Sequence, residues 1–301
     1  MTLAEFEEAR QGRKEASRAV AATLRECYSA KLRARAERME KCNNFFLGEL
    51  CPVCHTFHAT QGSRCRDRLC PDCGWTLAIE RSSGVRRALL NRGAGYTVFH
   101  VVLTKRDPLA ANGELLHEEC KKLIEGYSKL MRMRAVKRRV WGAVRSLEIS
   151  NNGISRYHPH IHALWVTKEE TIFAPYELNQ LWAKACELDY RPVTWIEGIY
   201  SKEAEHQETE EGRINAAVAE ATKYAIKPSL YMTADAPMLE ELDEGLKSLH
   251  LFACHGGMAA AYRQAQEELK AEKQWPGKQC IDCGSRTESI ALNYKNGGYV
   301  L

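Results

Sequence analysis

The amino-acid sequence predicts an α+β protein in which an antiparallel sheet is backed by helices. The first observation is an alternation of strand-like and helical patterns in the order β-α-β-β-α-β-α, which starts near residue 96. The second is composition: 45% hydrophobic and 27% charged residues are typical of a globular chain, and 301 residues can bury a sizeable core.

The individual elements follow from local residue patterns. Residues 1–41 hold ten Lys/Arg and seven Asp/Glu and predict a charged helix, whereas residues 42–75 are cysteine-rich and irregular. Strands are expected over 96–104, 141–150, 158–167 and 193–200, helices over 76–91, 113–139, 176–188, 213–227, 240–249 and 258–272, and an exposed loop over 203–211. The order of the central elements is that of a ferredoxin-like arrangement.

These elements suggest four parts of the chain. Residues 1–41 form the charged N-terminal helix and 42–75 a zinc-binding cysteine-rich segment. The central core of strands and helices would cover 76–235, and residues 236–301 would hold C-terminal helices and a small Cys-x-x-Cys tail.

The bulk properties bear on location and partners. The formal net charge of +4 is compatible with nucleic-acid binding without arguing for it. No apolar run approaches the roughly 18 residues of a membrane helix, and three glutamates within the first ten residues exclude a secretory signal. We therefore expect a cytoplasmic protein, whose twelve cysteines are reduced rather than paired in disulfides.

Three Cys-x-x-Cys pairs point to structural zinc. Cys51 and Cys54 are followed, after fifteen residues, by Cys70 and Cys73, and four thiolates at this spacing can close around one ion. The ligand set stays open, because Cys65, Cys280 and Cys283 are further candidates and Cys42, His55 and His58 lie close in sequence. The last two cysteines could complete a different site with some of the others.

The segment HPHIH carries the strongest chemical signal. Side chains alternate along a strand, so His158, His160 and His162 project from one side of the sheet. Neutral imidazoles two residues apart can bind one divalent ion. If the preceding strand pairs with this one through 151–156, Glu148 can supply a carboxylate and leave positions open for a phosphate oxygen. The alternative is a histidine cluster and an exposed carboxylate with no ligand role.

A second chemical stripe lies on the helix predicted over 213–227. Glu220, Tyr224 and Lys227 follow one another at spacings of four and three, which places them on one helical face. A phenol can attack a phosphodiester, a cation can stabilise the developing charge, and a carboxylate can activate a second nucleophile. By itself this spacing is also common among tyrosines that only pack.

Together these segments resemble the HUH endonucleases, and among them the rolling-circle replication initiators, or Rep proteins, of small bacterial plasmids. The matching pieces are VVLT near Leu103, HPHIH, the helix EATKYAIK, and CRDRLCPDC with the two cysteines before it, spread over about residues 51–260. This resemblance implies a ferredoxin-like HUH nuclease core and a sequence-specific, single-tyrosine nicking enzyme.

The resemblance also implies roles for individual residues. His160 and His162 would bind Mg²⁺ or Mn²⁺ with Glu148 as third ligand and His158 as a further candidate, while Tyr224 would be the nucleophile and Glu220 would help to end a replication round. The expected partners are single-stranded or hairpin origin DNA, a host helicase and the replication machinery. Basic candidates for phosphate contact, which could equally be solvated surface, are Arg64, Arg66, Arg68, Arg138 and Arg139.

Two other functions stay open. An HUH transposase or relaxase would share the chemistry but join different DNA, and the cysteine segment favours the plasmid initiator. A non-catalytic zinc module would only bind nucleic acid, and the histidine strand together with the tyrosine helix argues against it.

Overall fold

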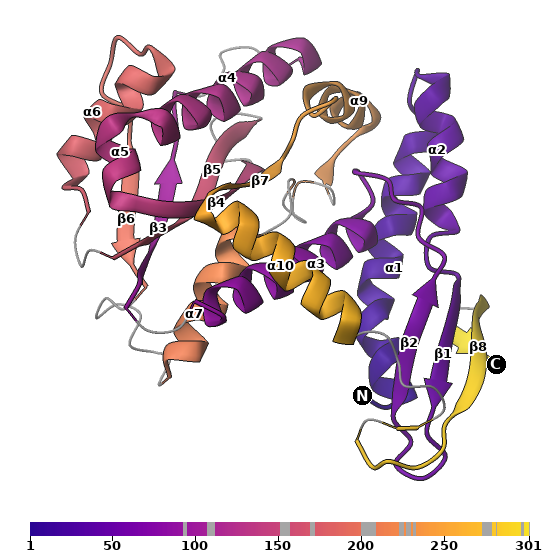
Figure 1. Cartoon of the computed structure of the whole chain (residues 1–301). Helices are drawn as coiled ribbons and strands as arrows, with labels where there is room; N and C mark the ends of the chain where they lie inside the picture. Colours follow the sequence, from indigo (N-terminus) through magenta and orange to yellow (C-terminus); the bar gives the residue numbers. More distant parts are fainter. Residues whose placement is uncertain are drawn as a thin grey trace. The chain divides into compact units, whose positions relative to one another are not determined.

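The computed structural model describes residues 1–92, 95–106, 112–150, 157–168, 172–199, 209–222, 226, 230, 233–272, 279–280, 282–295 and 298–300 (Figure 1). The chain divides into two compact units. We call Met1–Thr76, Tyr231–Glu240 and Glu272–Leu301 the cysteine unit, and Leu77–Leu230 and Glu241–Ala271 the sheet unit. Among the described residues, every helix is too short or too polar to cross a membrane.

The sheet unit is built on five antiparallel strands in the order β6-β3-β5-β4-β7. These strands are β3 (Thr97–Leu103), β4 (Val140–Ser150), β5 (His158–Thr167), β6 (Thr194–Gly198) and β7 (Phe252–Gly256). The long central strands β4 and β5 are almost entirely buried, because helices cover both of their faces.

One face of this sheet packs against three helices, α3 (Pro71–Leu90), α7 (Glu210–Ala221) and α10 (Gly257–Glu272). Their apolar side chains form one buried cluster with Val144 and Leu164, which project from the central strands. The C-terminal end of α7 is tied to the sheet on this face.

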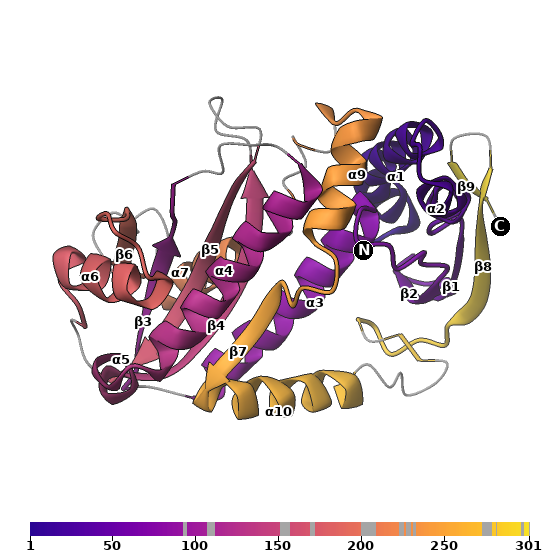
Figure 2. The same ribbon diagram turned by 90° about the horizontal axis from the view of Figure 1, so that it is seen from above.

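The opposite face is covered by α4 (Gly113–Arg132), which runs along the central strands in Figure 2, and by α6 (Pro175–Cys186), which packs beside α4. Asn112 caps α4 by accepting a hydrogen bond from the backbone N–H of Leu115. The short helix α5 (Arg134–Arg139) links α4 to β4. The two central strands are thus held in a fixed register between layers of helix.

The cysteine unit has its own sheet in the order β2-β1-β8-β9. The strands are β1 (Phe45–Leu50), β2 (Phe57–Gly62), β8 (Glu288–Lys295) and β9 (Gly298–Val300), and the helices are α1 (Leu3–Arg25) and α2 (Ala30–Glu40). A core of aromatic side chains joins α1 to this sheet, with Phe6 in edge contact with Phe46 and Phe57. The helix α9 (Ala236–Gly245) has residues in both units.

The α+β class with antiparallel sheets backed by helices is confirmed, and the strand predicted over 158–167 coincides with β5. Five expectations are wrong. The helix predicted over 113–139 is broken at Met133, whose backbone is extended, into α4 and α5. The helix predicted over 213–227 ends at Ala221, and Ile226 forms a β-bridge with Ile149 instead. Residues 1–41 form two helices, because α1 and α2 bury apolar side chains such as Leu24 and Met39. The stretch 42–75 contains the β1–β2 hairpin instead of being irregular. Residues 236–301 are not only helical, since they supply β7 to one sheet and β8 and β9 to the other.

Candidate metal centres

Two imidazoles and one carboxylate converge at one end of the central strands. In the antiparallel register of β4 and β5, Glu148 lies directly opposite His160, and Ser146 opposite His162. The Nε2 atoms of the two histidines are 3.1 Å apart, and Oε2 of Glu148 lies 3.9 Å from His160 Nε2 and 3.3 Å from His162 Nε2. The three side chains are at most 9% exposed.

The other ring nitrogens are held in place, so both Nε2 atoms point inward. Nδ1 of His160 lies 3.0 Å from the carbonyl oxygen of His158, to which it can donate. Nδ1 of His162 lies 3.1 Å from Nε2 of His100 on β3, whose ring stacks on that of His162 with 8° between the planes. Burial lowers the pKa of His160 to about 4, so its imidazole is neutral at pH 7 and can act as a ligand.

These distances fit a divalent cation. An ion with bonds of about 2.0–2.2 Å to nitrogen and oxygen ligands separates neighbouring ligand atoms by about 3.0–3.6 Å. The three donor atoms of Glu148, His160 and His162 are 3.1–3.9 Å apart, close to this range. Two histidines and a carboxylate occupy one side of an ion and leave the other side to water or substrate.

The end of helix α7 is fastened beside this triad. The hydroxyl of Ser146 donates a hydrogen bond of 2.7 Å to the carbonyl oxygen of Ala221, and Thr222 caps the helix by donating to Val218. The side chain of Glu220, the residue before Ala221, is 37% exposed, and its Oε1 lies 4.0 Å from Nδ1 of His162. A carboxylate from α7 therefore reaches the edge of the triad.

The other two residues predicted on this helical stripe, Tyr224 and Lys227, lie outside the described residues. The chain between them is fixed at one point, since Ile226 forms a parallel bridge with Ile149 next to Glu148. The third histidine of the strand, His158, lies opposite Ser150 and its ring centroid is 5.1 Å from that of His160.

The cysteines gather into two separate quartets, which corrects the predicted foursome of Cys51, Cys54, Cys70 and Cys73. We call the first quartet the 42/73 quartet; it contains Cys42, Cys65, Cys70 and Cys73. The sulfur of Cys73 lies 3.5 Å from that of Cys42 and 3.6 Å from that of Cys65. The predicted set is split because the β1–β2 hairpin separates its first pair from its second.

The second quartet, the 51/283 quartet, contains Cys51, Cys54, Cys280 and Cys283. Sulfur separations are 3.5 Å for Cys51–Cys283 and for Cys54–Cys280. Tetrahedral zinc with Zn–S bonds near 2.3 Å separates its sulfurs by about 3.8 Å, so both quartets have the size of such a site. Hydrogen bonding with Thr56 lowers the pKa of the Cys54 thiol to about 6, which favours the thiolate.

The predicted phosphate-binding arginines differ in what they contact. Arg64, Arg66 and Arg68 are exposed in the segment between β2 and α3, and Arg138 is exposed at the end of α5. Arg139 is engaged in internal contacts, because it donates to the carbonyl of Ile172 and pairs with Glu177 at 3.0 Å.

Two residues at these centres were not predicted as ligands or partners. His100 belongs to the strand pattern YTVFHVVLT, where one histidine among apolar residues gave no signal of its own. Cys42 stands apart from the Cys-x-x-Cys pairs, so spacing alone could not place it in the 42/73 quartet.

Comparisons with known proteins agree on one family. A sequence profile of the replication proteins named Rep_1 matches residues 56–296. "Protein rep" of Lentilactobacillus hilgardii is 30% identical over 223 residues, which cover 69% of this chain and 67% of that protein. "Protein rep" of a Bacillus species is 30% identical over 206 residues, 64% of this chain and 66% of the relative. The "Replication protein" of Staphylococcus aureus is 29% identical over 174 residues, 54% of this chain and 71% of the relative. No solved structure matches the chain.

Proposed function

This chain belongs to the Rep_1 family of replication proteins, and we propose that it starts rolling-circle replication of a plasmid by nicking origin DNA. The proposed reaction is a metal-dependent transesterification on single-stranded or hairpin DNA, with a tyrosine as nucleophile. The observation that carries the proposal is the convergence of His160, His162 and Glu148 within 3.9 Å of one another.

The topology of the sheet unit supports an HUH core. Its β-α-β-β-α-β portion contributes four strands, which are β3, β4, β5 and β6 in chain order. In the sheet they lie in the order β6-β3-β5-β4, that is fourth, first, third and second, and β7 is added at the edge beside β4. This order is that of a ferredoxin-like sheet. It puts the histidine strand in the middle, where β4 can present Glu148 from one side and β3 can present His100 from the other.

The proposed ligands are His160, His162 and Glu148, with His158 adjoining them. Bound there, Mg²⁺ or Mn²⁺ would polarise the scissile phosphate and hold it in line for attack. The protein itself orients the imidazoles through His158 and His100 and, by burying the triad, excludes competing ligands.

Tyr224 is the proposed nucleophile. Its phenolic oxygen loses a proton and bonds to phosphorus, the bond from phosphorus to the 3′-oxygen breaks, and that oxygen takes up a proton. The products are a 5′-phosphotyrosyl link and a free 3′-hydroxyl that primes synthesis. The bridge from Ile226 to Ile149 supports this assignment, since it holds the chain two residues after Tyr224 next to Glu148. Lys227 is the proposed cation for the developing phosphate charge.

Glu220 is proposed to act in termination. When Tyr224 is esterified to DNA, a different nucleophile must cut the regenerated junction. The Glu220 carboxylate, near the triad and partly exposed, can take a proton from a water molecule as that water attacks phosphorus.

The two cysteine quartets are proposed to bind one structural Zn²⁺ each. Four thiolates leave no open position for chemistry, so these ions would stabilise the cysteine unit instead of taking part in cleavage. The origin DNA, a host helicase and the replication machinery are the proposed partners, and Arg64, Arg66, Arg68 and Arg138 remain candidates for phosphate contact.

Covalent trapping tests the proposal. Purified protein is incubated with a single-stranded origin oligonucleotide and Mn²⁺, and a denaturing gel is inspected for a protein–DNA adduct. Wild type should form the adduct, whereas Tyr224→Phe and His160→Ala should not, although both should still bind DNA. His250→Ala, at an exposed histidine of the same unit, serves as control. Adduct formation by Tyr224→Phe would show that another residue is the nucleophile. Equal cutting before and after treatment with a chelator would show that the reaction needs no divalent metal.

A further inference from the structure

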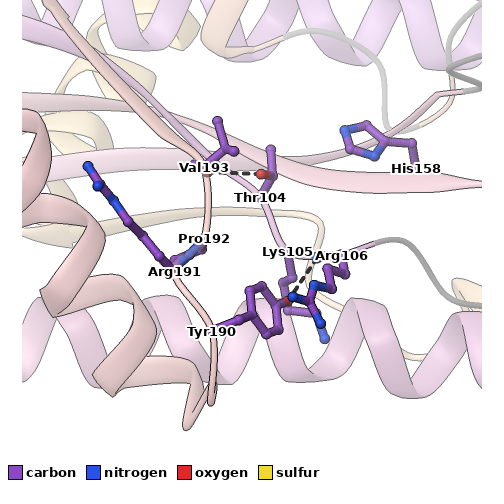
Figure 3. A pocket seen from close by; sticks show the side chains of 8 residues that line it. All are labelled: Thr104, Lys105, Arg106, His158, Tyr190, Arg191, Pro192 and Val193. Atoms are coloured by element: carbon purple, nitrogen blue, oxygen red, sulfur yellow. Dashed lines mark hydrogen bonds between the residues drawn. The ribbon is translucent and has the colours of Figure 1, made fainter.

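A hollow adjoins the triad on the sheet unit, at the end of β3. It has a volume of about 490 Å³ and is lined by residues that follow β3, by the segment that precedes β6, and by His158 at the start of β5 (Figure 3). This volume lies within the roughly 300–1,000 Å³ of pockets that bind small ligands. His158 precedes His160 by two residues and their ring centroids are 5.1 Å apart, so the hollow begins beside the proposed metal ligands.

The hollow contains a fixed aromatic ring with a cation over it. The hydroxyl of Tyr190 accepts a hydrogen bond of 2.8 Å from the backbone N–H of Arg106, and the guanidinium of Arg106 lies 4.0 Å from the centre of the Tyr190 ring. Figure 3 shows the two side chains together below Thr104, with His158 to the right of Thr104. A ring anchored at its hydroxyl keeps its orientation before any ligand arrives, which lowers the entropic cost of binding.

Two arginines, Arg106 and Arg191, line the hollow. Lys105 also lines it, but its ammonium group pairs with Glu119 and is only 9% exposed. Arg106 and Arg191 are both exposed, and neither pairs with a carboxylate among the residues that the structure describes. Figure 3 shows the Arg191 side chain directed away from Tyr190, and its guanidinium lies 5.3 Å from the centre of the Tyr176 ring, so Arg106 is the guanidinium that lies beside Tyr190.

This combination fits one nucleotide of a single strand. A base can stack on an aromatic ring or on a guanidinium plane, and exposed arginines can bind the flanking phosphates. A base inside a duplex cannot enter such a hollow, because it is already stacked and paired. The Thr104 hydroxyl donates a hydrogen bond to the carbonyl oxygen of Val193, so its proton is not available to a phosphate of the ligand.

We infer that this hollow is a nucleotide subsite, in which the base next to the scissile phosphate stacks on the Tyr190 ring while Arg106 binds a neighbouring phosphate. The inference rests on the proposed function, because it assigns the subsite to the strand that the triad would cut. Its role is to position the strand by backbone contacts and stacking, which tolerate different bases.

Binding measured without cleavage tests the inference. The probe is a short fluorescein-labelled oligothymidylate, and its anisotropy is followed with zinc-loaded protein in buffer without Mg²⁺ or Mn²⁺ at several salt concentrations. Tyr190→Leu should weaken binding about tenfold, because it removes one stacking surface, while Tyr190→Phe keeps the ring and should bind within about twofold of wild type. Equal affinities of the Leu and Phe variants would overturn the stacking role.

The salt dependence tests the phosphate contact separately. Arg106→Gln should reduce the slope of log K against log salt by about 0.7, the value for one phosphate of a single strand. The matched control is Arg263→Gln, which removes the same charge from an exposed position of α10 in the same unit. An equal slope for the two variants would overturn the assignment of Arg106.

The experiment also separates this inference from the proposed nuclease. Binding without Mg²⁺ or Mn²⁺ needs neither the proposed catalytic metal nor Tyr224, so a protein that forms no adduct can still show the difference between Tyr190→Leu and Tyr190→Phe. Conversely, if wild type forms the adduct and Tyr190→Leu binds oligothymidylate as tightly as wild type, the result supports the proposed nuclease and contradicts the proposed subsite.

Discussion

The contact between His100 and His162 predicts a measurable loss of metal affinity when its nitrogen is removed. His100→Phe keeps a ring that can stack on His162 and meet the edge of Trp195, whose ring centroid is 5.2 Å away, but it has no Nε2. Nδ1 of His162 then loses its partner at 3.1 Å. Loss of such an outer hydrogen bond to a metal-binding histidine lowers the affinity for the metal about 10- to 100-fold, which corresponds to about 1.4–2.7 kcal/mol of binding free energy.

Calorimetric titration with Mn²⁺ measures this effect. The cysteine quartets are first loaded with Zn²⁺, so that only the triad responds. His100→Gln should recover part of the affinity, because its amide nitrogen can lie near the position of Nε2, and His250→Phe provides the control at an exposed histidine. If His100→Phe binds Mn²⁺ as tightly as wild type, His100 does not position His162. A purely structural role would lower the thermal stability of both His100 variants alike without the partial recovery by Gln.

The remaining predictions concern termination and zinc. Glu220→Ala should still nick and form the adduct but fail to release unit-length product on a replication assay, whereas normal release would leave Glu220 without a role. Glu220→Tyr should cut the second junction through another covalent link, visible as a doubly attached species. Cys70→Ser and Cys280→Ser should each lower bound zinc, measured by a chromogenic chelator after unfolding, from two ions per chain to about one. A full zinc content in either variant would contradict the two quartets.

The sequence was most informative where function depends on neighbours along the chain. Alternation within β5 placed His160 and His162 on one side, and the short connection from β4 placed Glu148 beside them. Both inferences need only the period of a strand and the pairing of two consecutive strands. The strand and helix order of the central elements followed for the same reason, because each pattern is local.

Features that depend on distant pairing could not be predicted in this way. His100 meets His162 only because of the register between β3 and β5, in which Val102 is opposite His162 and His100 is its diagonal neighbour. The strand β7 is five residues long and gains its conformation by pairing with β4, about 110 residues earlier in the chain. The 51/283 quartet joins cysteines 232 residues apart, which no local spacing reports.

The 51/283 quartet, whose cysteines lie up to 232 residues apart in the sequence, affects the order in which a nascent chain becomes structured. All residues of the sheet unit have been synthesised when the ribosome reaches residue 271, whereas the cysteine unit still lacks β8 and half of the 51/283 quartet. Domains tend to fold as units during synthesis. The histidine triad can therefore form first, while one edge of the early strand β1 stays unpaired until β8 has been synthesised. A messenger RNA truncated between the codons for residues 271 and 288 would yield a chain that contains the triad but lacks β8. The exposed edge of β1 would make this product prone to aggregation.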